Sequence, residues 1–266
     1  MRNWFFILFV VLVTGCSSNE DKATTENSSK KETISSTKKE KKATPAKPIK
    51  EVKKHPKLTN ENVVRFMTKY GKENPETILR LSCKFGDIDI KLYTNTPIHR
   101  ANMVYLTKQG YFDLTQFYRV SPNFVDQAGN SDEWDCQVKR AEIGGYTLPA
   151  EFTPKNIHKF GSIAMARRYD KNPTKRSSPF EFYITLGHTY NDKEMRSHER
   201  EFGTKYTDTQ KDIFNTLGGV PYLDQQHTVI GEVINGMDVA LELNKVKVDG
   251  REWPLDEIAI TMKVIR

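Results

Sequence analysis

The chain has 266 residues, with 41 lysines and arginines against 34 acidic residues and a formal net charge of +7. Residues 1–60 hold 13 basic and six acidic residues, so this segment carries the whole excess, and the remainder is neutral with 28 of each. Nucleic-acid-binding proteins carry positive charge as a patch on a folded surface. An excess confined to a segment rich in serine and threonine excludes that class, so we expect no nucleic-acid partner.

The first 16 residues have the pattern of an export signal. Arg2 precedes ten consecutive apolar residues, Trp4 to Val13, whereas a helix that spans a bilayer needs about 20. The next segment, Val13-Thr14-Gly15-Cys16, resembles the lipobox of bacterial lipoproteins. This resemblance implies that Cys16 is acylated and becomes the new N-terminus, which would anchor the protein to a membrane of the bacterial cell envelope, outside the cytoplasm. A plain secretory signal and a buried cysteine are the alternatives.

Residues 17–60 form a segment rich in lysine, serine and threonine with almost no large apolar side chains. Such a composition cannot bury enough surface to offset the entropy of ordering the chain. We therefore expect a disordered tether, whose 44 residues would span on the order of 40 Å as a random coil. Its lysines allow either weak attraction to anionic headgroups or a simple solvated spacer.

Residues 61–266 have the patterns of a folded domain made mostly of short strands. Helices are indicated over 61–71, over 97–109 with Thr96 as the N-cap and Pro97 in the first turn, and over 237–245. Alternation of apolar and polar residues predicts eight strands, at 77–85, 87–93, 115–120, 124–129, 161–167, 180–186, 227–234 and 258–266. Without a βαβ rhythm, these strands favour an antiparallel barrel or sandwich.

The segment from Phe117 to Asn130, FYRVSPNFVDQAGN, predicts a hairpin around a Pro-centred turn. One face of this hairpin would carry Arg119, Phe124 and Gln127 together. A guanidinium and an amide beside an aromatic ring form a surface that suits an amide held against an apolar pocket, because the polar groups need partners and the ring excludes water.

The hairpin resembles the segment F-x-R-x-x-P-x-F-x-x-Q-x-G that opens the active face of the cyclophilin-type peptidyl-prolyl isomerases. Three later segments follow in the order of that family: GSIAMAR at 161–167, FEFYI at 180–184, and YLDQQHTVIG at 222–231. The similarity extends from about residue 76 to the C-terminus. It implies a closed eight-stranded antiparallel barrel with two capping helices and, in this chain, a partly helical insertion at 188–221. Because the interior of such a barrel is filled by side chains, the ligand site would lie on its outer face.

The chemistry that this resemblance implies is rotation about an X-Pro bond. Amide resonance gives that rotation a barrier of about 18–20 kcal/mol. A donor aimed at the proline nitrogen and a dry pocket would both lower it. Arg119 is the only strong fixed donor in the pattern, so its hydrogen bonds would strengthen in the twisted state. No nucleophile, metal or cofactor is required.

The resemblance also assigns residues to the substrate site. Phe124 would carry the proline ring, Gln127 would orient the peptide, and His227 would lie at the rim. The other expected substrate-binding residues are Val125, Ala166, Arg167, Glu181, Tyr183, Tyr222 and Leu223. A surface ion pair is the alternative for Arg119, an ordinary core for the apolar residues, and a partly exposed strand residue for His227.

Four positions depart from the usual family pattern: Arg167 for asparagine, Glu181 for glutamine, Tyr183 for phenylalanine, and Tyr222 for tryptophan or histidine. A carboxylate at 181 close to Arg119 would either hold the guanidinium or divert its donors from the substrate. The tyrosine at 222 argues against strong cyclosporin binding.

Two segments are longer than in a minimal cyclophilin: the basic loop RYDKNPTKRSSP at 168–179, and residues 188–221, which contain a helical pattern over 209–217. Both are either docking surfaces or tolerated decoration. His188 and His198 match no metal motif, so we expect solvated histidines. Cys83, in a strand pattern, and Cys136, in a polar loop, could pair outside the cytoplasm, but two free thiols are favoured.

The sequence thus predicts a membrane-anchored prolyl isomerase whose partners are proline-containing segments of exported proteins. Two alternatives stay open. One is a chaperone or adaptor that grips such segments without turnover because of Glu181. The other is a tethered structural protein of the envelope in which the pocket is unused.

Overall fold

The computed structural model describes residues 55–266. The export signal, Cys16 and most of the tether lie outside the described residues. Strand β1 (Leu58–Thr59) pairs in parallel with β6 (Gly144–Gly145), and Leu58 is completely buried. The folded part therefore includes residues that the sequence assigned to the tether.

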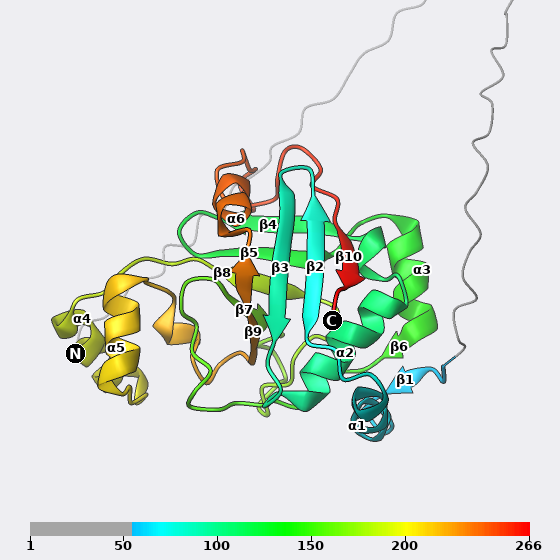
Figure 1. The fold of residues 1–266 in the computed structure, drawn as a ribbon, viewed down its shortest axis with the longest axis horizontal. Coiled ribbons are helices and arrows are strands. Elements are labelled where there is room, and N and C mark those ends of the chain that lie inside the picture. Colours follow the sequence, from blue (N-terminus) through cyan, green and yellow to red (C-terminus); the bar gives the residue numbers. More distant parts are fainter. Residues whose placement is uncertain (1–54) are drawn as a thin grey trace, which may run out of the picture. The chain divides into compact units, whose positions relative to one another are not determined.

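The central element is an antiparallel sheet of eight strands, in the order β10-β2-β3-β9-β7-β8-β5-β4 (Figure 1). A strand lies at each of the eight positions predicted from the alternation of the sequence. Their bounds are β2 (Ile78–Cys83), β3 (Gly86–Leu92), β4 (Gln116–Ser121), β5 (Val125–Asn130), β7 (Ser162–Met165), β8 (Phe182–Thr185), β9 (Val229–Asn235) and β10 (Thr261–Val264). The prediction of a mostly β, cyclophilin-like fold is confirmed.

The expected closed barrel is wrong, because the sheet is an open half-barrel. Its edge strands β4 and β10 approach each other only just before β10 begins, where Gln116 forms an isolated bridge to Ala259. Further along β4, the backbone N–H of Val120 donates instead to the carbonyl oxygen of Glu252, at 2.8 Å. A loop rather than a strand therefore covers this part of the β4 edge.

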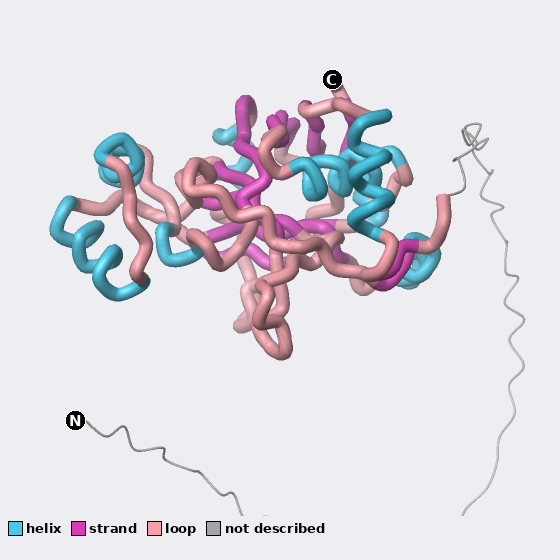
Figure 2. Tube along the Cα trace, turned by 90° about the horizontal axis from the view of Figure 1, so that it is seen from below, coloured by secondary structure: helices cyan, strands magenta, loops and turns pink. Residues whose placement is uncertain are grey.

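The helices are also more numerous than the two that were expected to cap the barrel. Residues 55–266 hold α1 (Val63–Glu73), α2 (Pro97–Lys108), α3 (Trp134–Ile143), α4 (Asp192–Phe202), α5 (Asp208–Thr216) and α6 (Met237–Leu243), with 3-10 turns η1 (Phe112–Leu114) and η2 (Pro221–Leu223). Helices α1, α2 and α3 lie at one end of the sheet, and α4 and α5, which the insertion forms, lie at the other (Figures 1 and 2). None of the helices within residues 55–266 combines the length and hydrophobicity needed to cross a bilayer.

A bulge in β4 decides which side chains reach the outer face of the sheet. Phe117 pairs with Ala128 and Arg119 with Gln127, so two residues of β4 oppose one of β5. Strict alternation would put Phe117 and Arg119 on the same face. Because of the bulge, Phe117 is completely buried in the main core, whereas Arg119 points outward.

Gly129 allows β5 and β8 to lie unusually close. Its backbone has φ +94°, and a Cβ atom placed there would lie 2.1 Å from the carbonyl oxygen of Phe180. Only glycine fits such an approach without displacing the backbone. This accounts for the glycine that ends the Q-x-G part of the hairpin motif.

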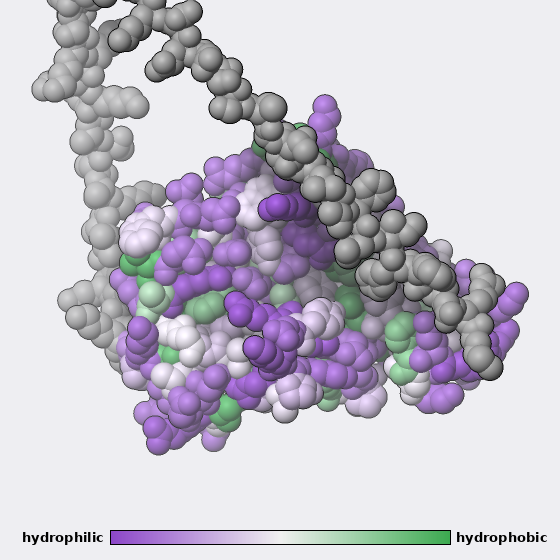
Figure 3. Space-filling view, turned by 180° about the vertical axis from the view of Figure 1, so that it is seen from behind, coloured by the Kyte–Doolittle hydropathy of each residue, from purple (hydrophilic) through white to green (hydrophobic). Residues whose placement is uncertain are grey.

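The surface opposite the view of Figure 1 is mostly hydrophilic. Where residues 1–54 do not cover this face, its hydrophobic residues form small separate patches (Figure 3). Scattered apolar residues of this kind are normal for a protein surface and indicate no extended apolar interface on the visible part of that face.

A buried carboxylate in β5 fastens the β4–β5 hairpin to α6. Asp126 has no exposed surface, and one of its oxygens accepts a hydrogen bond of 2.6 Å from the side chain of Asn244. Asn244 also donates to the carbonyl oxygen of Ser121 and accepts from the backbone N–H of Asn123. The second oxygen of Asp126 is buried without a partner. Burial raises the pKa of Asp126 to about 7, although the hydrogen bond from Asn244 opposes the shift.

Stability should therefore fall as the pH rises from about 4 to about 7. The folded protein holds the Asp126 proton more tightly than the unfolded chain, so the full stability is present below the unfolded pKa and the loss is complete above the folded pKa. A difference of about three pKa units sets a ceiling of about 4 kcal/mol on this effect. Urea unfolding at pH 5 and pH 8 measures it, and Asp126→Asn should flatten the difference. Equal pH dependence in the two proteins would contradict the assignment.

Candidate functional site

A cavity of about 260 Å³ opens on the outer face of the sheet. Nine of the eleven residues predicted for the site line it, together with Tyr169, which the sequence did not single out. The lining residues are Arg119, Phe124, Val125, Gln127, Ala166, Arg167, Tyr169, Tyr183, Leu223 and His227. The four sequence blocks thus meet at one place, and the roles expected for their residues stay predictions.

The floor of the cavity is a small hydrophobic cluster separate from the main core. Val125, Tyr183 and Leu223 belong to it, and Phe124 packs against it from the rim. Tyr183 in β8 pairs with Gln127 in β5 on one side and with Ala164 in β7 on the other. The middle strands of the sheet therefore fix the walls, while the β4–β5 turn and η2 supply Phe124 and Leu223.

Arg119 is held over this floor by a carboxylate that the sequence did not reveal. Its guanidinium carbon lies 5.5 Å from the centre of the Phe124 ring, and its Nε donates to Glu252 at 2.7 Å. Within residues 55–266, no other nitrogen of Arg119 makes a hydrogen bond. The pair thus orients the guanidinium while its two terminal nitrogens stay available to a ligand.

Glu252 is itself fixed by its neighbours. The hydroxyl of Ser121 donates to its other oxygen at 2.6 Å, and its backbone lies in the left-handed region, with φ +64°. The hydrogen bond from Ser121 and the positive charge of Arg119 hold the pKa of Glu252 below its ordinary value, although burial opposes the shift. Glu252 therefore stays ionised through the neutral range. It lies 133 residues from Arg119 in the sequence, so no local pattern could have indicated the pair.

Glu181 does not approach Arg119, contrary to our expectation. Its side chain accepts a hydrogen bond of 3.0 Å from Arg140 in α3, and it lines a neighbouring cavity rather than the one around Arg119. The reason is that α3 fills the position expected for a polar loop and presents Arg140 to Glu181. Glu181 therefore neither holds nor diverts the donors of Arg119.

Tyr222 also lies outside the cavity, but it remains part of its rim. Its ring stacks on Phe124, with 5.9 Å between ring centres and an angle of 17°, and 41% of its surface is exposed. The amide nitrogen of Gln127 contacts the hydroxyl of Tyr118, which orients the side chain toward the cavity.

His227 forms a buried wall of the cavity and is held at both ring nitrogens. Nδ1 lies 3.1 Å from the carbonyl oxygen of Met165, and Nε2 lies 2.7 Å from the hydroxyl of Tyr169. Burial lowers the pKa of His227 to about 4. The imidazole is therefore neutral near pH 7 and presents no positive charge to a ligand.

A chain of buried hydrogen bonds joins the cavity to the insertion. The hydroxyl of Tyr183 lies 3.0 Å from Nε2 of His158, and Nδ1 of His158 lies 2.6 Å from Asp224. The other oxygen of Asp224 accepts from the hydroxyl of Tyr206, at 2.9 Å. Tyr206 lies between α4 and α5 and packs against Phe214 of α5. The tyrosine at 183, a departure from the family pattern, is what extends this network to the cavity wall.

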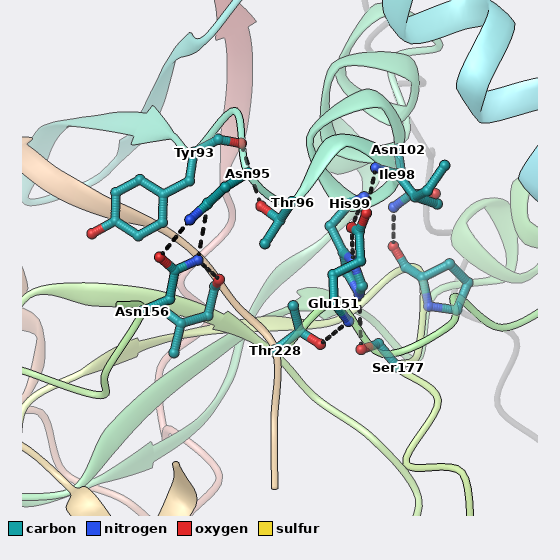
Figure 4. Close-up of polar contacts among 12 residues, drawn as sticks. Tyr93, Asn95, Thr96, Ile98, His99, Asn102, Glu151, Asn156, Ser177 and Thr228 are labelled. Atoms are coloured by element: carbon teal, nitrogen blue, oxygen red, sulfur yellow. Dashed lines mark hydrogen bonds and ion pairs between the residues drawn. The ribbon is translucent and has the colours of Figure 1, made fainter. Parts of the chain in front are cut away.

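A second buried network fixes the end of the basic loop. Ser177 contacts His99 at 3.0 Å, and His99 contacts Glu151 at 2.6 Å, while Glu151 accepts from the backbone N–H groups that begin α2 (Figure 4). The order of groups is that of a hydrolytic triad, but Ser177 and His99 are 1% and 0% exposed. Because no substrate can reach the hydroxyl, this cluster is a structural clamp.

The remaining histidines and cysteines add no chemistry to the site. His198 is buried and stacks on Phe202, so the expectation of a solvated histidine is wrong for it, whereas His188 is exposed. Cys83 and Cys136 are both free thiols, the alternative favoured above. Residues 55–266 contain no group of three or more histidines, cysteines or acids that could hold a metal ion.

Removal of the Tyr206 hydroxyl should destabilise the protein by about 1–3 kcal/mol, because one oxygen of Asp224 would be left buried without a donor. Tyr206→Phe tests this by urea unfolding. Tyr190→Phe is the matched control, since Tyr190 packs on the same Phe214 and its hydroxyl makes no hydrogen bond within residues 55–266. If the network is continuous, Tyr206→Phe and Tyr183→Phe will be non-additive by at least about 0.5 kcal/mol. Additive costs would show two separate contacts.

Comparison with known proteins agrees with this geometry. Residues 78–264 match the family model described as "Cyclophilin type peptidyl-prolyl cis-trans isomerase/CLD". A Staphylococcus aureus (strain USA300) protein named "Putative peptidyl-prolyl cis-trans isomerase" is 29% identical over 176 residues, which cover 66% of this chain and 84% of that protein. A Staphylococcus epidermidis protein of the same name is 27% identical over the same lengths.

A solved structure shows the same fold. The cyclophilin-type isomerase of Cryptosporidium parvum, crystallised in the presence of the dipeptide Ala-Pro, aligns with a TM-score of 0.50 and 20% identity, over 71% of this chain and 99% of that one. At this identity the likeness concerns the fold alone. Because the family model covers most of the described residues, the chain belongs to the cyclophilin-type peptidyl-prolyl cis-trans isomerase family.

Proposed function

We propose that this protein isomerises X-Pro bonds in exported proteins while a lipid on Cys16 holds it to a membrane, and that Arg119 is its catalytic residue. The observation that carries the proposal is the position of the Arg119 guanidinium, 5.5 Å over the Phe124 ring and fixed through Nε by Glu252. The pattern of residues 1–16 supports the location outside the cytoplasm.

The cavity would act on the substrate in two ways. The apolar floor around Phe124 and Leu223 would take the proline ring and exclude water, which disfavours the charge-separated planar amide. The free terminal nitrogens of Arg119 would donate to the prolyl nitrogen, whose lone pair becomes available only when the bond twists. Because this hydrogen bond is stronger in the twisted state, it lowers the barrier rather than only tightening binding.

The neutral state of His227 fits this chemistry. A second positive charge in the cavity would attract the carbonyl oxygen of the planar, resonance-stabilised amide and so stabilise the ground state. With a pKa of about 4, His227 leaves Arg119 as the charged donor beside the floor at neutral pH.

The alternative of a chaperone without turnover loses its original basis. It rested on a carboxylate at 181 that engages Arg119, and Glu181 pairs with Arg140 instead. The carboxylate that does engage Arg119, Glu252, contacts Nε alone. The distinction between the two functions is then a matter of turnover.

Arg119→Ala should reduce kcat/KM about 30- to 150-fold, because about 2–3 kcal/mol of transition-state stabilisation is typical of a lost donor of this kind. The assay follows cis-to-trans relaxation of a short X-Pro peptide. Arg119→Lys keeps the charge but loses the planar fork, and serves as the conservative control. A wild-type protein that binds the peptide without accelerating its relaxation would instead establish the chaperone.

Glu252→Gln should lower kcat/KM by about three- to tenfold, since a neutral amide holds the guanidinium less firmly than a carboxylate. In a background of Arg119→Ala, the same change should have no further effect, because both act through one group. Glu257→Gln, at an exposed position nearby in the chain, is the matched control. An increase of kcat/KM in Glu252→Gln would show that Glu252 diverts Arg119 from the substrate.

A further inference from the structure

The basic loop at residues 167–176 separates two cavities. Its alternate residues face opposite sides: Arg167 and Tyr169 line the site cavity, whereas Arg168 and Asp170 line a second cavity of about 550 Å³. Arg176 also borders the second cavity. A peptide bound at the site would therefore pass beside this loop as it leaves the floor.

The loop carries five basic residues and one acid in a folded part that is otherwise balanced. The basic residues are Arg167, Arg168, Lys171, Lys175 and Arg176, and the acid is Asp170. Because residues 61–266 hold 28 basic and 28 acidic residues, this excess of four charges is local. It is placed next to the site rather than spread over the surface.

Two of these arginines are oriented without being neutralised. Arg167 donates to the carbonyl oxygen of Gln226 at 2.6 Å, and Arg176 donates to the hydroxyl and the carbonyl oxygen of Thr147, both at 2.6 Å. All of these acceptors are uncharged. Within residues 55–266, none of the five basic side chains of the loop lies within 4.0 Å of a carboxylate. Arg119 and Arg140, by contrast, each pair with a glutamate.

The loop is also held in shape. The side chain of Asn172 donates to the carbonyl oxygens of Arg168 and Arg176 and accepts from the backbone N–H of Arg176. The next residue, Ser177, is fastened to α2 and Glu151 by the clamp of Figure 4. The positive charges therefore stand in place before a ligand arrives, which reduces the entropy lost on binding.

We propose that the basic loop selects X-Pro substrates with aspartate or glutamate next to the X-Pro pair. This inference rests on the proposed function and names its substrate class. An acidic side chain would meet preoriented guanidinium groups whose charge is not already satisfied. A peptide is favoured over an anionic lipid surface, because Arg167 and Arg176 are half-buried beside cavities, where an extended chain fits and a flat surface does not.

Three peptides that differ only in the residues flanking X-Pro, as glutamate, glutamine or lysine, test the proposal. We expect kcat/KM for the glutamate peptide to exceed that for the glutamine peptide about fivefold at low salt, with the lysine peptide lowest. The ratio should shrink toward one in about 0.5 M salt, where screening acts over a few ångströms. Equal values for the three peptides at low salt would overturn the proposal.

The double variant Arg168→Gln/Arg176→Gln should bring the glutamate-to-glutamine ratio close to one. The readout is this ratio, so a change in the absolute rate does not affect the test. Arg196→Gln/Arg200→Gln, which removes two exposed charges from α4, is the matched control and should keep the ratio. A preference that survives in the loop variant would overturn the proposal.

Two further measurements separate this inference from its neighbours. If no peptide is isomerised but the glutamate peptide binds about fivefold more tightly in a fluorescence titration, the selectivity stands and the proposed catalysis fails. If instead the loop variant loses binding to phosphatidylglycerol vesicles while its peptide ratio equals that of the wild type, the loop serves a membrane surface and the proposal is overturned.

Discussion

The pair of Arg119 and Glu252 is the interaction on which the site depends. A guanidinium above an aromatic ring has many orientations, and a carboxylate at Nε selects one of them without occupying the terminal nitrogens. The open edge of the sheet makes this pair possible. Where a strand would otherwise complete the barrel, the loop around Glu252 lies against β4 and bonds to Val120. The gap in the half-barrel is therefore part of the site rather than a defect of the fold.

The insertion acts on the site from the opposite side. Tyr206 contributes its hydroxyl to Asp224, and through His158 the contact reaches Tyr183 in the cavity wall. Buried polar networks are stable only when every member has a partner, so a tyrosine at 183 requires the groups behind it. The departure at 183 and the long insertion are thus physically linked. This favours a supporting role for residues 188–221 over tolerated decoration.

The sequence predicted what depends on short-range patterns. All eight strands follow from alternation, and the lining of the cavity follows from four motifs, because both are encoded within a few residues. Three features could not be predicted. The β4 bulge, which puts Phe117 in the core and Arg119 outside, leaves no trace in a period of two. The partners of Arg119 and Glu181 lie 133 and 41 residues away in the chain. Helix α3 was missed because only Cys136 and Ile143 of its ten residues are buried, so its apolar stripe is faint.

The arginines of this protein divide according to what holds them. Arg119 and Arg140 are held by carboxylates, which fix a guanidinium and cancel most of its long-range field. Arg167 and Arg176 are held by neutral oxygens, which fix it and leave its field intact. The difference matches the ligands that each would meet. The prolyl nitrogen is uncharged, so a directed donor at short range is sufficient there. An acidic flank is recognised by charge, and for that purpose a guanidinium already neutralised by glutamate would be ineffective.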